Sequence, residues 1–103
     1  MRDGGIWLSK FRFNKALHQR GLSYDMQGLI HFRLAAINRD TDEFRLRVKK
    51  ICQDTAGDEW QALYRFLTDS SVNHVYIYNT YRIPPQLLFR WKRAVYCALR
   101  QFV

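Results

Sequence analysis

Apolar residues recur every three or four positions along most of this chain, and that spacing limits its possible folds more than any other feature. The clearest example runs from Gln86 to Phe102, with an apolar stripe made of Leu88, Trp91, Val95, Ala98, Leu99 and Phe102. Such a stripe is typical of an amphipathic helix that packs one face on other helices. The pattern predicts a mainly α-helical protein.

Two further helices are expected in the first third of the chain. One extends from Ser9 to Arg20, with Phe13 and Leu17 one turn apart and Gly21 as its stop. The next is capped by Ser23 and ends at a turn over 38–40. Its predicted buried stripe consists of Met26, Leu29, Ile30, Arg33, Leu34 and Ile37.

The middle of the chain predicts a helix pair. Asp40 or Thr41 can cap a third helix, with Glu43 placed as a capping box requires, and Gly57 ends it. Its predicted inner face consists of Phe44, Val48, Ile51, Cys52 and Thr55. Asp58 is expected to cap a fourth helix, whose apolar positions are Trp60, Leu63, Tyr64 and Leu67.

The segment from Val72 to Ile83 is rich in residues that favour strands. A short helix is still preferred, because the only available strand partner lies near the N-terminus. The alternative is a two-stranded element made of 6–13 and 75–82. Ile83-Pro84-Pro85 then begins the last helix, since proline is tolerated in a first helical turn.

Together these segments predict a compact bundle of five to six short helices with a helix-turn-helix-like unit at its C-terminal end. At 103 residues and 48% hydrophobic composition, one domain over 1–103 with one core is expected. Residues 1–5 are predicted to form a flexible arm.

The charge indicates the class of partner. Seventeen basic and nine acidic residues give a net charge of +8 and a pI near 9.9. Asp69 is the last acidic residue, and the chain after it carries five positive side chains, Arg82, Arg90, Lys92, Arg93 and Arg100. A pI above about 9 in a small domain is typical of nucleic-acid binding.

Catalysis is not expected. The three histidines and two cysteines show no metal-ligand spacing, and no glycine-rich phosphate loop is present, so no metal or cofactor is predicted. Cys52 and Cys97 are predicted to be free thiols on apolar helix faces, which fits a reducing cytoplasm. No apolar stretch is long enough to span a membrane, and Lys10 and Arg12 interrupt any signal-peptide core.

The residues 58–102 have the order of a helix-turn-helix, in which the second helix enters the DNA major groove. Gln86, Arg90 and Arg93 recur on one side of that helix, where glutamine can pair with adenine and arginine with guanine. Phosphate contacts are assigned to Lys92 and Arg100. The turn residue Arg82 and, at the start of the preceding helix, Asn73 complete the predicted interface.

The stretch Ile77-Tyr-Asn-Thr-Tyr-Arg-Ile83-Pro-Pro-Gln-Leu-Leu88-Phe-Arg90-Trp91-Lys-Arg93 resembles the C-terminal helix-turn-helix of sigma-factor region 4 and the small phage late-transcription regulators related to it. Tyr78, Arg82 and Pro84 stand where that pattern has a small residue, a turn glycine and a small polar cap. The resemblance implies a DNA-binding transcriptional regulator with Gln86, Arg90 and Arg93 facing the bases.

A sequence-reading DNA-binding protein of phage type is therefore the leading hypothesis, with homodimerisation as an option. Binding of RNA through charge and stacking is a second hypothesis, because it needs the same basic surface. The alternative from another class is a protein-interaction module, such as a small phage-type inhibitor or adaptor acting on a host protein or ribonucleoprotein. Tryptophan, tyrosine and arginine would then form the contact surface.

Overall fold

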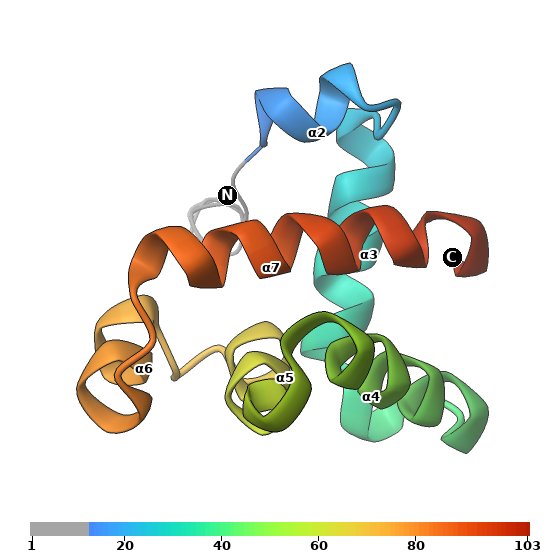
Figure 1. The fold of residues 1–103 in the computed structure, drawn as a ribbon. Helices are drawn as coiled ribbons and strands as arrows, with labels where there is room; N and C mark the ends of the chain where they lie inside the picture. The colour runs from blue at the N-terminus through green and yellow to red at the C-terminus, as the bar shows by residue number, and fades with distance from the viewer. Residues whose placement is uncertain (1–12) are drawn as a thin grey trace, which may run out of the picture.

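A computed structural model describes residues 13–103, and within that range the chain is helical and contains no strand (Figure 1). The elements, in order, are α2 (Lys15–Gln19), α3 (Tyr24–Ala35), η1 (Ile37–Arg39), α4 (Asp42–Ala56), η2 (Gly57–Glu59), α5 (Trp60–Thr68), α6 (His74–Tyr81), α7 (Pro85–Leu99) and η3 (Arg100–Phe102). The predicted mainly α-helical bundle is confirmed.

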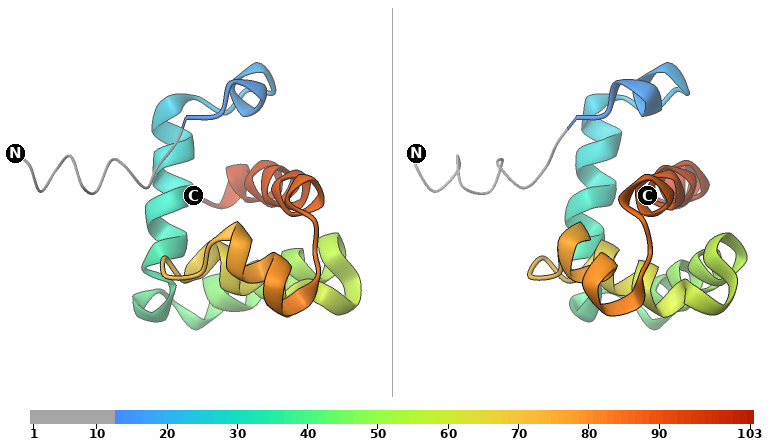
Figure 2. Two further views of the ribbon diagram at one scale, coloured as in Figure 1. Left: turned by 90° about the vertical axis from the view of Figure 1, so that its left-hand side faces the viewer. Right: turned by 60° about the vertical axis from the view of Figure 1, so that its left-hand side comes forward.

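The long helix α7 lies in the middle of the bundle. It packs against α3, α4, α5 and α6. Figures 1 and 2 show α2 on one side of it, α4 to α6 on the other, and α3 running across it. The fully buried centre includes Ile30, Leu34, Val48, Cys52, Leu63, Ile77, Leu88, Val95 and Leu99. One continuous apolar core therefore holds all these helices together.

The helix α2 is shorter than predicted. Asn14 caps it by accepting a hydrogen bond from the Leu17 backbone N–H, and Gly21 ends it with a φ of +96°. Phe13 consequently precedes the helix and is exposed, whereas Leu17 is buried as expected. The predicted arm over 1–5 and the predicted helical residues 9–12 lie outside the described residues.

The helix α3 begins at its predicted cap, Ser23, but one position of its predicted stripe is wrong. Leu29 is 59% exposed, and the buried side chain on this turn is Gln27. Gln27 accepts a hydrogen bond from the Asn14 N–H and donates to the carbonyls of Asn14 and Leu22. These bonds compensate its burial and fix α2 against the start of α3.

The helix α4 has the predicted ends, with Thr41 as the N-cap and Gly57 after its last residue. The prediction that Asp58 caps the next helix is wrong. Gly57–Glu59 instead form the turn η2, which continues directly into α5, and no side chain caps α5. The chain therefore passes from α4 to α5 through a tight turn.

The segment with strand propensity forms the helix α6, as preferred. Asn73 caps it, and Ile77 points into the core. The two-stranded alternative is wrong for 75–82, because its residues up to Tyr81 are helical; its partner 6–13 lies outside the described residues apart from Phe13. The helix forms despite the β-propensity of its individual residues, with a side-chain cap at Asn73 and one buried anchor, Ile77.

The predicted stripe of α7 is correct at Leu88, Val95 and Leu99, which are buried. Trp91 is only half-buried, and Tyr96 is buried in addition to the predicted positions. The inward face of α7 is thus rotated slightly from the predicted one.

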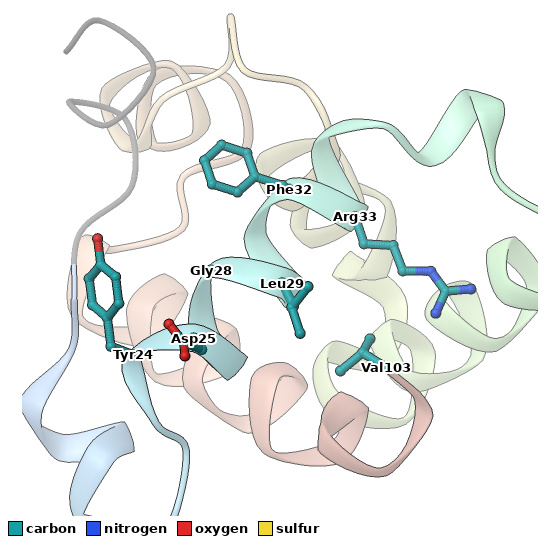
Figure 3. A pocket seen from close by; sticks show the side chains of 7 residues that line it. All are labelled: Tyr24, Asp25, Gly28, Leu29, Phe32, Arg33 and Val103. Atoms are coloured by element: carbon teal, nitrogen blue, oxygen red, sulfur yellow. The ribbon is translucent and has the colours of Figure 1, made fainter. Parts of the chain in front are cut away.

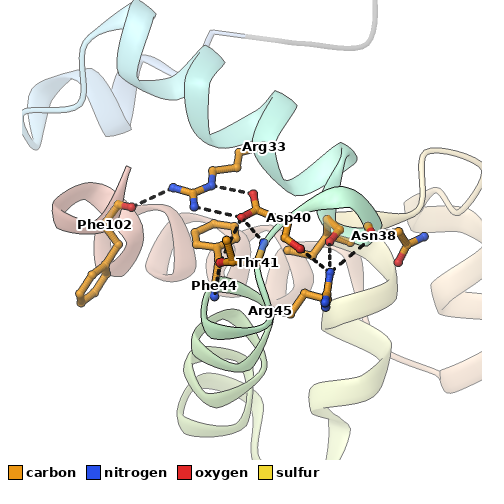
Figure 4. Close-up of polar contacts among 8 residues, drawn as sticks. Arg33, Asn38, Asp40, Thr41, Phe44, Arg45 and Phe102 are labelled. Carbon is orange, nitrogen blue, oxygen red and sulfur yellow. Dashed lines mark hydrogen bonds and ion pairs between the residues drawn. The ribbon is translucent and has the colours of Figure 1, made fainter.

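An ion pair with several hydrogen bonds closes the end of the bundle where α3, α4 and the C-terminus meet (Figure 4). The Arg33 guanidinium binds both carboxylate oxygens of Asp40, at 2.8 and 3.1 Å, and donates to the Phe102 carbonyl at 3.1 Å. It also lies 3.6 Å from the centre of the Phe44 ring. Arg45 donates to the carbonyls of Ile37 and Asp40 from the other side.

The Arg33 hydrogen bonds hold the pKa of Asp40 at about 2, below its ordinary 3.8. This contribution to stability is complete above pH 3.8 and disappears as the pH falls through about 2. We expect Asp40→Asn to lower the urea midpoint at pH 7, and the difference from the wild type to shrink between pH 4 and pH 2. Asp58→Asn, at an exposed carboxylate, is the control; a pH-independent deficit in Asp40→Asn would contradict this account.

Candidate nucleic-acid interface

The side of α7 that faces away from the core carries three of the predicted contact residues. Gln86 and Arg90 are exposed and Arg93 is half-buried. They are four and three residues apart, so they lie along one side of the helix, opposite the buried Leu88 and Val95. We call Gln86, Arg90 and Arg93 the outer face of α7.

The positive charges of this face lack carboxylate partners in the described part of the chain, unlike four of the cations on α3 and α4. The arginines and lysines with ion-pair partners among residues 13–103 lie on α3 and α4: Arg33 with Asp40, Arg45 with Asp42, Arg47 with Glu43 and Lys50 with Asp54. Within the same residues, no carboxylate pairs with Arg82, Arg90 or Arg93. The positive potential of this region is therefore uncompensated and attracts an anionic partner.

Arg82 stands in the three-residue connection between α6 and α7. Its φ is +62°, the left-handed conformation that glycine adopts without strain, and it is the single non-glycine residue with positive φ in 13–103. Its N–H caps α6 by donating to the Tyr78 carbonyl at 2.9 Å, while its side chain is exposed. An arginine held in this conformation costs about 1–2 kcal/mol relative to a relaxed backbone.

Arg100 lies seven residues, or about two helical turns, beyond Arg93, but part of its guanidinium has a structural partner. One of its nitrogens donates to the Arg20 carbonyl at 2.9 Å, across 80 residues of sequence. This bond joins α7 to the end of α2. Arg20, whose carbonyl accepts this bond, is itself exposed.

Two predicted contact residues are placed in other roles. The Asn73 side-chain oxygen accepts a hydrogen bond from the Tyr76 N–H at 2.9 Å, so it is occupied as the cap of α6. Lys92 is half-buried on the α5 side of α7, with its ammonium 5.8 Å from the Phe66 ring centre and 5.6 Å from that of Tyr96. The structure does not bring Lys92 onto the outer face, and burial lowers its pKa.

The helix α6 exposes two tyrosine rings and one aliphatic side chain. Tyr76 and Tyr78 are 40% and 46% exposed, and Val75 is 52% exposed. Arg65 donates hydrogen bonds to the hydroxyls of Tyr76 and Tyr81, at 3.3 and 3.0 Å. A hollow of about 300 Å³ lies between α6 and the start of α7, lined by His74, Val75, Tyr78 and Pro85.

A second, larger concave surface lies on α3, away from the outer face of α7. It has a volume of about 740 Å³ and is lined by Tyr24, Asp25, Gly28, Leu29, Phe32, Arg33 and Val103 (Figure 3). The exposed Leu29 projects toward it. Periodicity alone places Leu29 in the core, so the sequence does not predict this groove.

Residues 13–103 contain no group of three or more His, Cys, Asp or Glu side chains placed to bind a metal ion. Both cysteines are free thiols. Cys52 is fully buried, and burial raises its pKa to about 12, so it stays protonated and unreactive at neutral pH.

Comparison of the chain with known protein families, with curated proteins and with solved structures found no match in any of the three. Across residues 13–103, every helix is too short or too polar to cross a lipid bilayer.

The position of Lys92 leads to a prediction. A half-buried ammonium with a lowered pKa destabilises the fold at neutral pH, and stability rises as the pH approaches the ordinary lysine value of 10.5. We expect Lys92→Met to raise the free energy of unfolding at pH 7 in urea titrations, with a smaller gain at pH 10. Destabilisation at pH 7 would instead show that the ammonium–ring contacts outweigh the cost of burial.

Proposed function

We propose that this protein binds nucleic acid, with duplex DNA as the favoured partner, and acts as a small transcriptional regulator without catalytic activity. The observation that carries the proposal is the distribution of ion pairs. Four cations on α3 and α4, namely Arg33, Arg45, Arg47 and Lys50, have carboxylate partners, whereas Arg82, Arg90 and Arg93 have none among residues 13–103. Unpaired arginines in line along an outward helix face are suited to contact phosphates and base edges.

The connectivity at the C-terminal end supports the DNA-binding form of the proposal. The helices α6 and α7 are joined by three residues, the connection length of a helix-turn-helix. The second helix has 15 residues, or about 22 Å at 1.5 Å per residue. A helix of this length fits along a segment of the major groove, and the resemblance to sigma-factor region 4 assigns this same helix to base recognition.

RNA binding and a protein-interaction module are the other two candidates. Structured RNA could use the same arginines together with the exposed tyrosines of α6. A protein partner would use a different surface, the α3 groove with its exposed Leu29. The free thiols fit the reducing cytoplasm in which all three functions would operate.

The test is the affinity of the purified chain for labelled duplex DNA, single-stranded DNA and RNA, measured by fluorescence anisotropy over a salt series. We expect duplex binding to be tightest and to weaken steeply as salt increases. Arg90→Ala and Arg93→Ala should each weaken it by about 1–3 kcal/mol, or roughly 5- to 150-fold.

Lys50→Ala is the matched control, because it removes one positive charge from an exposed site on α4 that is paired with Asp54. It should change the affinity by less than about twofold. Equal small losses in all three variants would indicate a diffuse electrostatic surface in place of a defined interface. Absence of binding to every nucleic acid, from a folded protein, would overturn the proposal and direct attention to the α3 groove.

A further inference from the structure

The connection between α6 and α7 combines a strained arginine with a hollow beside it. Arg82 occupies a backbone conformation that glycine would adopt freely, and its exposed guanidinium makes no hydrogen bond or ion pair with residues 13–103. Within that range, then, no contact of the side chain offsets the backbone strain. Strained positions of this kind are concentrated at binding sites.

The hollow lies between α6 and the start of α7, and its lining residue Tyr78 precedes Arg82 by one helical turn. Its lining residues are His74, Val75, Tyr78 and Pro85, and its volume of about 300 Å³ is at the lower end for small-ligand pockets. Tyr78 is joined directly to Arg82, because the Arg82 N–H donates to its carbonyl. A flat, half-exposed ring therefore lies one helical turn from an unpaired cation.

We infer that this corner, formed by Val75, Tyr78, Arg82 and Pro85, binds one unpaired nucleotide of a nucleic acid. The base stacks against Tyr78 and Pro85, and Arg82 contacts the adjoining phosphate. The inference rests on the proposed function, because the outer face of α7 holds the neighbouring duplex. It defines the nucleic-acid ligand more narrowly, as a duplex that carries an unpaired base.

Charge complementarity favours a nucleotide over an apolar protein side chain at this corner. An apolar side chain bound in the hollow would pack against Val75 and Pro85. It would leave the Arg82 guanidinium without a partner. The next exposed polar residues along the chain are Gln86 and Arg90, and neither Arg82 nor Arg90 has a carboxylate partner within 13–103. A stacked base with a phosphate beside it uses both the ring and the cation.

The experiment compares two labelled DNA probes by fluorescence anisotropy: a blunt duplex, and the same duplex with a three-nucleotide single-stranded overhang. We expect the wild type to bind the overhang probe at least about fivefold more tightly. Tyr78→Leu, which keeps an apolar side chain but removes the ring, should abolish this advantage and leave the blunt-duplex affinity unchanged. Tyr24→Leu, at a similarly exposed tyrosine on α3, is the matched control and should keep the advantage.

The variant Arg82→Gly tests whether a loss of affinity comes from the missing charge or from a less stable fold. Glycine relieves the left-handed backbone, so the urea midpoint should stay the same or rise. The affinity for the overhang probe should nevertheless fall, and a loss that accompanied a lower midpoint would count against a phosphate contact.

Two results would overturn the inference while leaving the proposed function intact: equal affinity of the wild type for both probes, or an unchanged overhang advantage in Tyr78→Leu. The second result would indicate that the hollow serves another partner, such as a protein side chain. Failure of the proposed function is distinguishable, because the folded wild type would then bind neither probe.

Discussion

Burial of one side of α7 determines the arrangement of the rest of the molecule. Leu88, Val95 and Leu99 are completely enclosed, and four other helices supply the enclosing side chains. Because α7 is a continuous helix, enclosing these three positions also sets the direction of every other side chain on it. Arg90 and Gln86 face outward for this reason alone, and no specific contact is needed to orient them.

Several polar contacts between elements stabilise the scaffold. At one end, Arg33 joins α3, the start of α4 and the C-terminal turn through Asp40 and the Phe102 carbonyl. Gln27 and Arg100 fix α2 against α3 and α7. These bonds satisfy buried groups or close the chain ends, so they stabilise the scaffold. The arginines of the outer face take no part in this network and remain available to a partner.

The left-handed Arg82 connects the fold with the proposed interface. A connection of three residues must reverse the chain between α6 and α7, and a positive φ accomplishes this at the end of a helix. Glycine would satisfy that need with less strain. The arginine at this position adds an exposed positive charge to the corner that we propose as a nucleotide site.

Most helix boundaries could be predicted from the sequence because they depend on local chemistry. A serine or threonine that bonds the N–H three residues ahead starts a helix wherever it lies, as at Ser23 and Thr41, and glycine ends one, as at Gly57. The charge of the last helix was equally certain from its composition. The shared outward position of Gln86, Arg90 and Arg93 followed from periodicity, since residues at such steps share a helix side.

Only the tertiary structure decided which apolar and charged side chains are buried. Periodicity identifies a helix side but not how wide a neighbouring helix covers it, so Leu29 was assigned to the core and lies outside it. The same reason applies to Lys92, which α5 half-covers. The sequence by itself determined that the chain is helical and basic, because these properties are local. The tertiary structure determined which of its side chains are buried, because burial depends on how the helices pack against one another.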